Sequence, residues 1–223
     1  MKVLLTSLAL SFASASVPSQ EAAPRPAAAT LSAPKGASQS DARGFIHRWL
    51  ILEPVPVAGR LTEPAVREAL EKAPHPGPAN GLPRNGDEAT IAGTSVRWHA
   101  LDTSNYNVNL YHFAWSLSKP TSNALFWVIT TIDSSREIQD VRLAIGSNAA
   151  SRWWLNDQPV IALNDDRQAV IDDGVSKRLT LKQGRNVIRA AIINGGGATD
   201  FCARFLDSND KPIPGLTVSL SSP

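Results

Sequence analysis

The sequence has almost no cysteine and no strong excess of charge of either sign. Among its 223 residues there is one cysteine, Cys202, which excludes an intramolecular disulfide and any cysteine-rich metal site. Lysine and arginine total 22 and aspartate and glutamate total 20, which gives a formal net charge of +2. A balance so close to zero indicates neither nucleic acid nor an anionic membrane as a partner.

The single cysteine lies in a segment with the alternation of a β-strand. Phe201, Ala203 and Phe205 occupy every second position of FCARFL, as side chains on one face of a strand do. A free cysteine in such a setting behaves as a small hydrophobic residue. We therefore expect Cys202 to be buried and inert rather than a catalytic thiol.

Long apolar runs are also missing. After the N-terminus, no segment approaches the roughly 18 apolar residues that a membrane-spanning helix needs. The apolar segment Val3–Phe12 is too short for that role, follows Lys2, and precedes the small residues Ala13 and Ala15. This arrangement is typical of a bacterial secretory signal peptide. We expect residues 1–15 to be such a peptide, and the mature protein to be secreted or periplasmic without a membrane span.

The segment after the expected signal peptide has few side chains that a core would bury. Residues 16–40 consist mainly of Ala, Pro and Ser, and so little apolar surface does not offset the entropy of ordering the chain. We expect residues 16–40 to be a disordered linker. Residues 41–223 then form one domain, a size that supports a single core.

Most apolar segments after Ser40 are short, rich in β-branched or aromatic residues, and bounded by Gly, Asn, Asp or Pro. These features are typical of antiparallel β-strands. They predict an all-β sandwich of the jelly-roll kind, with Gly184 in a hairpin turn between two strands. The expected strands lie within residues 45–57, 94–101, 107–117, 124–132, 140–146, 151–156, 178–194 and 201–206.

One segment has helical rather than strand periodicity. In residues 61–73, Val66, Ala69 and Leu70 have helical spacing, Thr62 can cap the first turn, and Pro64 lies where a missing N–H costs nothing. We predict one short surface helix here.

No recognised catalytic motif is present. The sequence contains neither G-x-S-x-G nor H-E-x-x-H, and hydroxyl nucleophiles are weak until a base activates them. The four histidines His47, His75, His99 and His112 are isolated in the sequence, and His47 and His112 fall in expected strands. We interpret them as structural, although residues distant in sequence can converge in a fold. The sequence assigns no catalytic residue and no cofactor, and it leaves enzyme activity open.

The segment LNDDRQAVIDDG is rich in carboxylates. Asp165, Asp166, Asp172 and Asp173 lie within a few residues, and Ca²⁺ prefers oxygen ligands. Their spacing does not match a known calcium loop, and Arg167 lies among them as a counter-ion. Turn residues and surface ion pairs are the favoured interpretation, and a bound Ca²⁺ stays open. The glycines of INGGGATD lack the context of a phosphate-binding loop, and we expect a flexible connection between strands there.

Three segments together resemble a known family. They are RWLILEPVPV at residues 48–57, RLAIGSNAASRWWLNDQPV at 142–160, and LKQGRNVIRAAIINGGGATDFCARFLDSNDKPIPGL at 181–216. They are similar to the galactose-binding-like β-sandwich modules of secreted bacterial carbohydrate-active proteins, and most of all to modules that accompany acetylxylan esterases. The resemblance runs from about Phe45 to Val218 and implies a galactose-binding-like fold.

The resemblance is stronger for the fold than for a ligand site. Trp154, Leu155 and Asn156 match a W-L-N-G motif in which Asp157 replaces the glycine, and Gly184 and Asn186 match a K-G-W-N turn. The family loop G-S-D-D-G is matched only at its start, by Gly146, Ser147 and Asn148. Ala149 and Ala150 stand where that loop has an acid and a glycine, which weakens the carry-over of its ligand-binding role.

The paired tryptophans of the middle segment predict a core face and a second face. Alternation assigns Ser151, Trp153 and Leu155 to the core, and Arg152, Trp154 and Asn156 to the other side. An aromatic plane beside forked hydrogen-bonding groups suits a sugar. We therefore expect Trp154, Arg152, Asn156 and Asn148 to bind a ligand. The alternative is that Trp154 packs under the helix or a loop.

Three functions stay open. The leading hypothesis is a secreted, non-catalytic carbohydrate-recognition or accessory module in the breakdown of xylan-type plant polysaccharide. Its partners would be a polysaccharide or oligosaccharide and a carbohydrate-active enzyme. The alternatives are an acetylxylan-esterase-type hydrolase, or a structural, partner-binding sandwich with no small ligand.

Overall fold

The computed structural model describes residues 31–57, 62–72, 81–91, 93–165 and 168–220. The expected signal peptide, residues 16–30 of the expected linker, His75, Asp166 and Arg167 lie outside these ranges. Within them, no helix is long and apolar enough to cross a membrane.

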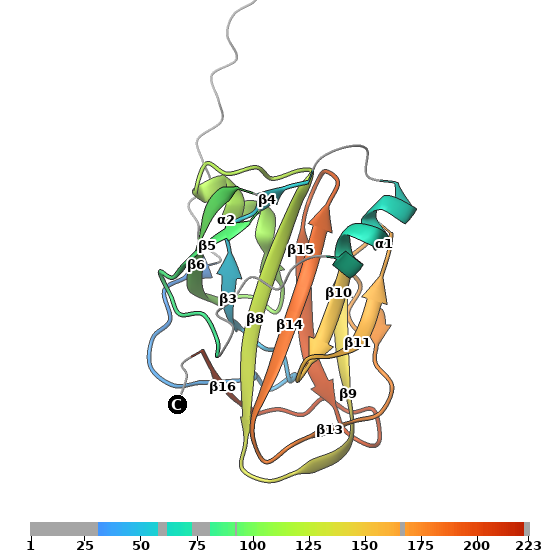
Figure 1. Cartoon of the computed structure of the whole chain (residues 1–223). Coiled ribbons are helices and arrows are strands. Elements are labelled where there is room, and N and C mark those ends of the chain that lie inside the picture. The colour runs from blue at the N-terminus through green and yellow to red at the C-terminus, as the bar shows by residue number, and fades with distance from the viewer. Residues whose placement is uncertain (1–30, 58–61, 73–80, 92, 166–167, 221–223) are drawn as a thin grey trace, which may run out of the picture.

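Two antiparallel sheets pack face to face (Figure 1), which confirms the predicted all-β sandwich. The larger sheet runs in the order β1 (Leu31–Ser32), β6 (Thr94–Thr103), β3 (Arg48–Leu52), β8 (Ala124–Ser134), β14 (Gly184–Asn194), β10 (Ala150–Leu155) and β11 (Gln158–Leu163). Attached to it are β5 (Glu88–Ile91), β4 (Val55–Pro56), β16 (Thr217–Ser219) and β2 (Ser38–Gln39). The smaller sheet runs β12 (Gly174–Val175), β9 (Ile138–Ser147), β15 (Asp200–Leu206) and β7 (Val108–Asn109), with β13 (Leu179–Leu181) beside β9.

The core between the sheets is built from alternate residues of each strand. On β14, for example, Ile188, Ala190 and Ile192 are buried in it. At its centre Trp49 meets Trp153 and Phe201 edge to face, with ring centroids 6.3 and 4.9 Å away. Offset and edge-to-face arrangements of this kind are the favourable ones for aromatic pairs.

The outer face of the larger sheet is also apolar, because a helix covers part of it. Helix α1 (Glu63–Lys72) buries Val66 and Leu70 against this face and contacts β10 and β14 (Figure 1). The Thr62 hydroxyl accepts the Ala65 N–H at 3.4 Å, and the Thr62 carbonyl accepts the Val66 N–H at 2.9 Å. The predicted helix is confirmed, with its cap.

A second helix replaces part of a predicted strand. The segment 107–117 was expected to be extended, but Leu110–Ser116 forms helix α2. The Asn109 side chain accepts the His112 N–H at 2.7 Å, which is the bond an N-cap residue makes. His112 therefore lies on a helix and not on a strand.

Part of the expected linker belongs to the sandwich. Residues 31–40 were expected to be disordered, but Leu31 and Ser32 pair with β6 and Ser38 and Gln39 pair with β16. Arg48 also donates to the carbonyls of Lys35 and Gly36. Backbone pairing and one buried guanidinium order a segment that has little apolar surface.

The turn at Gly184 is present, but it does not form a hairpin. Gly184 has a φ of +84°, which glycine adopts without strain. The strands that flank it lie in different sheets, since β13 pairs with β9 and β14 pairs with β8. The predicted hairpin is therefore wrong, and the turn carries the chain from one sheet to the other.

Candidate functional site

Strand β10 presents its side chains as the alternation predicted. Ser151, Trp153 and Leu155 are buried, whereas Arg152 and Trp154 are half-buried. The Trp153 indole N–H donates to the Ser151 hydroxyl at 3.0 Å, so the polar atom of this core residue has a partner. The two adjacent tryptophans thus occupy opposite faces of the larger sheet.

Trp154 packs on the outer face against a second tryptophan. Its ring stacks on Trp127 of β8, with centroids 5.6 Å apart and planes 25° apart. Ala191 of β14 pairs with Arg152 on one side and with Trp127 on the other. Because the side chain of Ala191 is a single methyl group, the rings of Trp154 and Trp127 can meet across Ala191. The stack holds Trp154 in one orientation.

Two arginines flank this ring. The guanidinium of Arg152 lies 5.8 Å from the centre of the Trp154 ring, and its Nη1 is 3.5 Å from Oε1 of Glu71 on α1. Arg189 pairs with Trp154 across β14 and β10 and forms an ion pair with Asp157. We call Trp154, Arg152 and Arg189 the Trp154 surface. It combines part of an indole ring with guanidinium donors, the groups that contact the C–H face and the hydroxyls of a sugar.

The two expected asparagine ligands have other partners. The side chain of Asn156 donates to Asn186 at 3.0 Å and accepts the Val187 N–H at 2.9 Å, and it follows β10 in a turn where its φ is +50°. Asn148 precedes β10, donates to the Ala198 carbonyl and accepts the Asp200 N–H. The structure thus brings Arg152 and Trp154 together, and places Asn148 and Asn156 at opposite ends of the strand.

Sequence reasoning missed two residues of this site, Trp127 under the Trp154 ring and Arg189 beside it. Trp127 lies in the continuous apolar run of β8, in which both faces are buried, so alternation assigns it to neither face. Arg189 was visible as a charged residue between apolar neighbours in β14. That pattern indicates that Arg189 points outward, but it does not show which residue of a neighbouring strand lies beside Arg189.

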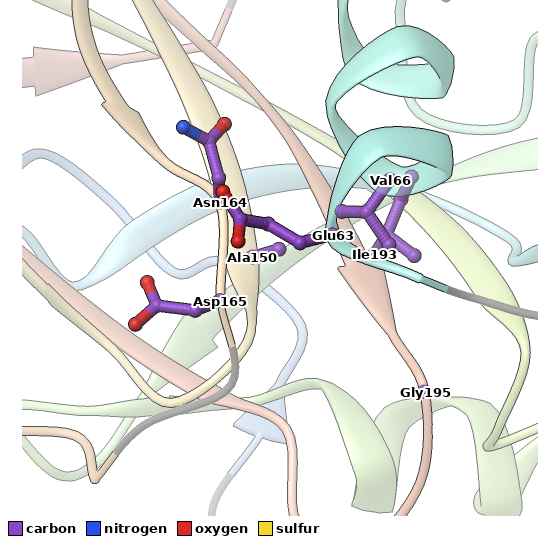
Figure 2. A pocket seen from close by; sticks show the side chains of 7 residues that line it. All are labelled: Glu63, Val66, Ala150, Asn164, Asp165, Ile193 and Gly195. Atoms are coloured by element: carbon purple, nitrogen blue, oxygen red, sulfur yellow. The ribbon is translucent and has the colours of Figure 1, made fainter.

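A pocket of about 200 Å³ lies at the other end of the outer face. Figure 2 shows Glu63 extending from α1 toward the end of β11, where Asn164 and Asp165 follow. Val66, Ala150, Ile193 and Gly195 complete the lining. The pocket thus combines an apolar floor with oxygen acceptors at its rim.

The described carboxylates of the segment LNDDRQAVIDDG, residues 163–174, do not all lie at one site. Asp165 lines this pocket, whereas Asp172 forms an ion pair with Arg204 of β15. Among the described residues, no group of three or more His, Cys, Asp or Glu side chains is placed to hold a metal ion. Asp166 lies outside the described residues. The ion pair of Asp172 agrees with the favoured interpretation of a surface partner.

Two of the described histidines, His47 and His99, lie within hydrogen-bond distance of carboxylates. The Nε2 of His47 is 3.1 Å from an oxygen of Asp41, and its Nδ1 is 3.2 Å from the Thr103 carbonyl. Both ring nitrogens of His47 therefore face an acceptor oxygen, and neither faces a hydroxyl or thiol that it could activate. His99 lies 3.2 Å from Oε1 of Glu53, whose other oxygen is 3.0 Å from Lys119.

Glu53 and Cys202 have perturbed pKa values with structural causes. Burial opposes the charge on Glu53, but hydrogen bonds from Lys119 and His99 hold the pKa of Glu53 below its usual range. Burial raises the pKa of Cys202 to about 11, so its reactive thiolate form is scarce at neutral pH. Cys202 is buried, as expected from the sequence.

No protein-family model and no curated protein matches the chain. Among solved structures, a β-glucosidase from Kluyveromyces marxianus in complex with glucose matches with a TM-score of 0.41 and 16% identity, over 73% of this chain and 17% of the β-glucosidase chain. The PA14 domain of the antifreeze protein MpAFP matches with a TM-score of 0.46 and 10% identity, over 86% of this chain and 97% of that domain. A GH31 α-xylosidase from Xanthomonas citri matches with a TM-score of 0.31 and 9% identity, over 84% of this chain and 18% of the xylosidase.

These likenesses are distant. The chain spans less than a fifth of the β-glucosidase and of the α-xylosidase, which are the two enzymes among the three. The three TM-scores are all below 0.5, and such distant likenesses support no functional conclusion.

Proposed function

We propose that the protein is a non-catalytic carbohydrate-recognition module that binds its ligand at the Trp154 surface. The observation that carries this proposal is the placement of Trp154. The ring is half-buried, is fixed by its stack on Trp127, and has the Arg152 guanidinium 5.8 Å from its centre and Arg189 as its neighbour on the adjacent strand. A sugar ring presents C–H groups to an aromatic plane and hydroxyls to forked donors, and this surface offers both.

The sequence resemblance supports the finer parts of the proposal. Modules of the family that the segments 48–57, 142–160 and 181–216 resemble accompany secreted enzymes that act on plant polysaccharides. We infer that the ligand is a xylan-type polysaccharide, that the N-terminal segment exports the chain, and that a carbohydrate-active enzyme is its functional partner. Both ring nitrogens of His47 face acceptor oxygens, so this histidine offers no support for esterase chemistry.

The test is retention of the purified protein on affinity gels and a glycan array that include xylo-oligosaccharides and galactosides. We expect weak, millimolar binding, which corresponds to only about 4 kcal/mol. Trp154→Ala and Arg152→Gln should each weaken it about tenfold or more, because a few central residues carry most of a binding energy.

Arg136→Gln is the matched control. It removes one positive charge from the exposed turn between β8 and β9, away from β10, and it should leave binding unchanged. Wild-type protein that binds no glycan, or Trp154→Ala protein that binds like wild type, would overturn the proposal. Hydrolysis of acetylated xylan above a heat-treated control would instead support the esterase alternative.

A further inference from the structure

A second aromatic and basic cluster lies on the opposite side of the sandwich. Among the described residues, Tyr106 is the one aromatic residue counted as exposed, with 39% of its surface accessible. Its ring rests on the buried ring of Phe45, with centroids 5.3 Å apart. The backbone of Phe45 forms an antiparallel β-bridge with Arg204 of β15. The alternate residues Phe201, Ala203 and Phe205 of that strand face the core, so Arg204 and this cluster face outward.

The guanidinium of Arg43 lies over both rings. It is 5.5 Å from the centre of the Tyr106 ring and 4.9 Å from that of Phe45, which are cation–π distances. The backbone of Arg43 is fixed, because its N–H and that of Phe45 both donate to the Asp41 carboxylate at 2.9 and 2.8 Å. The arginine is thus held at the surface before any ligand arrives.

Among the described residues, the guanidinium of Arg43 contacts the two rings and makes no hydrogen bond or ion pair. No described carboxylate lies within ion-pair distance of its guanidinium, whereas the nearby Arg204 is paired with Asp172. The acceptors of Asp41 are occupied by the two N–H groups and by His47. Arg43 is therefore the charged group at this site whose donors are directed to no described acceptor, and it lies beside an exposed aromatic ring.

This chemistry fits one kind of ligand. A guanidinium offers a planar fork of donors that matches a carboxylate with two parallel hydrogen bonds. The exposed face of Tyr106 offers a surface for the C–H groups of a ring next to that carboxylate. A uronic acid residue carries both groups on one ring.

We propose that Arg43 and Tyr106 form a binding site for uronic acid residues of a polysaccharide, separate from the Trp154 surface. This inference rests on the proposed carbohydrate-recognition function and names a ligand class for a second site. Because the two sites lie on opposite faces of the sandwich, one polysaccharide chain can engage either without the other.

The test is calorimetric titration of the full chain at fixed ionic strength. The uronate probes are tetragalacturonate and a xylotriose carrying one glucuronate, and the matched neutral probes are galactotetraose and xylotetraose. We expect at least one uronate probe to bind tenfold or more tightly than its neutral match. Arg43→Gln should remove that preference and Tyr106→Ala should weaken it, whereas Tyr106→Phe should keep it. Arg136→Gln removes an equal charge elsewhere and should behave as wild type.

The outcomes separate the two proposals. The uronate site is overturned if uronate and neutral probes bind equally, or if Arg43→Gln keeps the preference for uronate. In either case, binding of neutral glycans through Trp154 leaves the proposed function standing. If inorganic sulfate displaces the uronate probes completely and Tyr106→Ala has no effect on their binding, Arg43 is a site for any anion, and the uronate proposal is also overturned. No binding of any glycan overturns both. Circular dichroism and melting temperatures like those of wild type show that the variants fold.

Discussion

The adjacent tryptophans of β10 allow the same substitution to be made on the two faces of one sheet. Trp153 is fully buried, and its ring meets Trp49 and Phe201 with centroids 6.3 and 5.5 Å away. Truncation of a buried tryptophan costs about 3–5 kcal/mol, and each aromatic pair contributes about 0.5–1.5 kcal/mol beyond its buried area. Trp153→Ala also leaves the buried Ser151 hydroxyl without its indole partner. We expect the upper half of the range, about 4–5 kcal/mol.

Trp154→Ala should cost less. The half-buried ring loses its stack on Trp127, about 0.5–1.5 kcal/mol, and its cation–π contact with Arg152, about 0.5–1 kcal/mol. The buried part of the ring, which packs against the outer-face cluster, adds about 1 kcal/mol of transfer free energy. We therefore expect a total near 2–3.5 kcal/mol for Trp154→Ala. For a domain of this size each kcal/mol lowers the melting temperature by about 2–4 °C, so the two variants should differ by several degrees.

The assay is urea unfolding followed by circular dichroism, with thermal melts of the same proteins. Tryptophan fluorescence is not used, since the substitutions change it directly. Trp153→Phe keeps an edge-to-face ring in the core and should lose less than Trp153→Ala. Equal losses in Trp153→Ala and Trp154→Ala, or a larger loss in Trp154→Ala, would refute the assignment of the two rings to different environments and with it the Trp154 surface.

Two further predictions concern the smaller sheet. A Cβ at Gly146 would lie 2.4 Å from the Val170 carbonyl oxygen, so Gly146→Ala should cost about 1–3 kcal/mol. Gly196→Ala, which meets nothing within 4 Å, should be near neutral in the same urea assay, and equal effects would contradict the steric argument. Burial raises the pKa of Asp200, with nearby His112 opposing, so the folded state holds this proton more tightly than the unfolded chain. Asp200 therefore lowers stability as pH rises from its unfolded pKa of about 3.9 towards the raised folded value. Asp200→Asn should gain stability over wild type from pH 4 to 7, and a constant difference across that range would count against this.

The sequence predicted the fold where one periodicity was dominant. In β10 every second residue enters the core, so the alternation of Ser151, Trp153 and Leu155 placed both tryptophans correctly. In α1, helical spacing agreed with a capping threonine. Local and long-range interactions favour the same conformation in both segments, and such agreement is what makes a segment predictable.

The segment that became α2 carries two periodicities at once. Leu110, Phe113 and Ala114 are buried at helical spacing, yet apolar residues also occur at alternate positions of NVNLYHFAWSL. The discriminating signal was Asn109, since its side chain caps the first turn. At residues 31–40 the prediction of disorder was based on composition. Composition reports how much apolar surface a segment can bury, but this segment is ordered by backbone pairing to β6 and β16.

The candidate sites were harder to predict, because residue type shows what a side chain can bind and the fold decides whether its donors are already used. Asn148 and Asn156 are chemically suited to sugars, yet the side chains of both are already hydrogen-bonded to residues distant in the sequence, Ala198 and Asn186. Arg43 and Arg48 are close in sequence and equal in charge. Arg48 donates to Asp102 and to two backbone carbonyls that residues 31–40 bring to it, so its guanidinium stabilises the fold. Arg43 lies on two aromatic rings, and its guanidinium forms no ion pair with a described carboxylate, which is why the proposed uronate site is built on it.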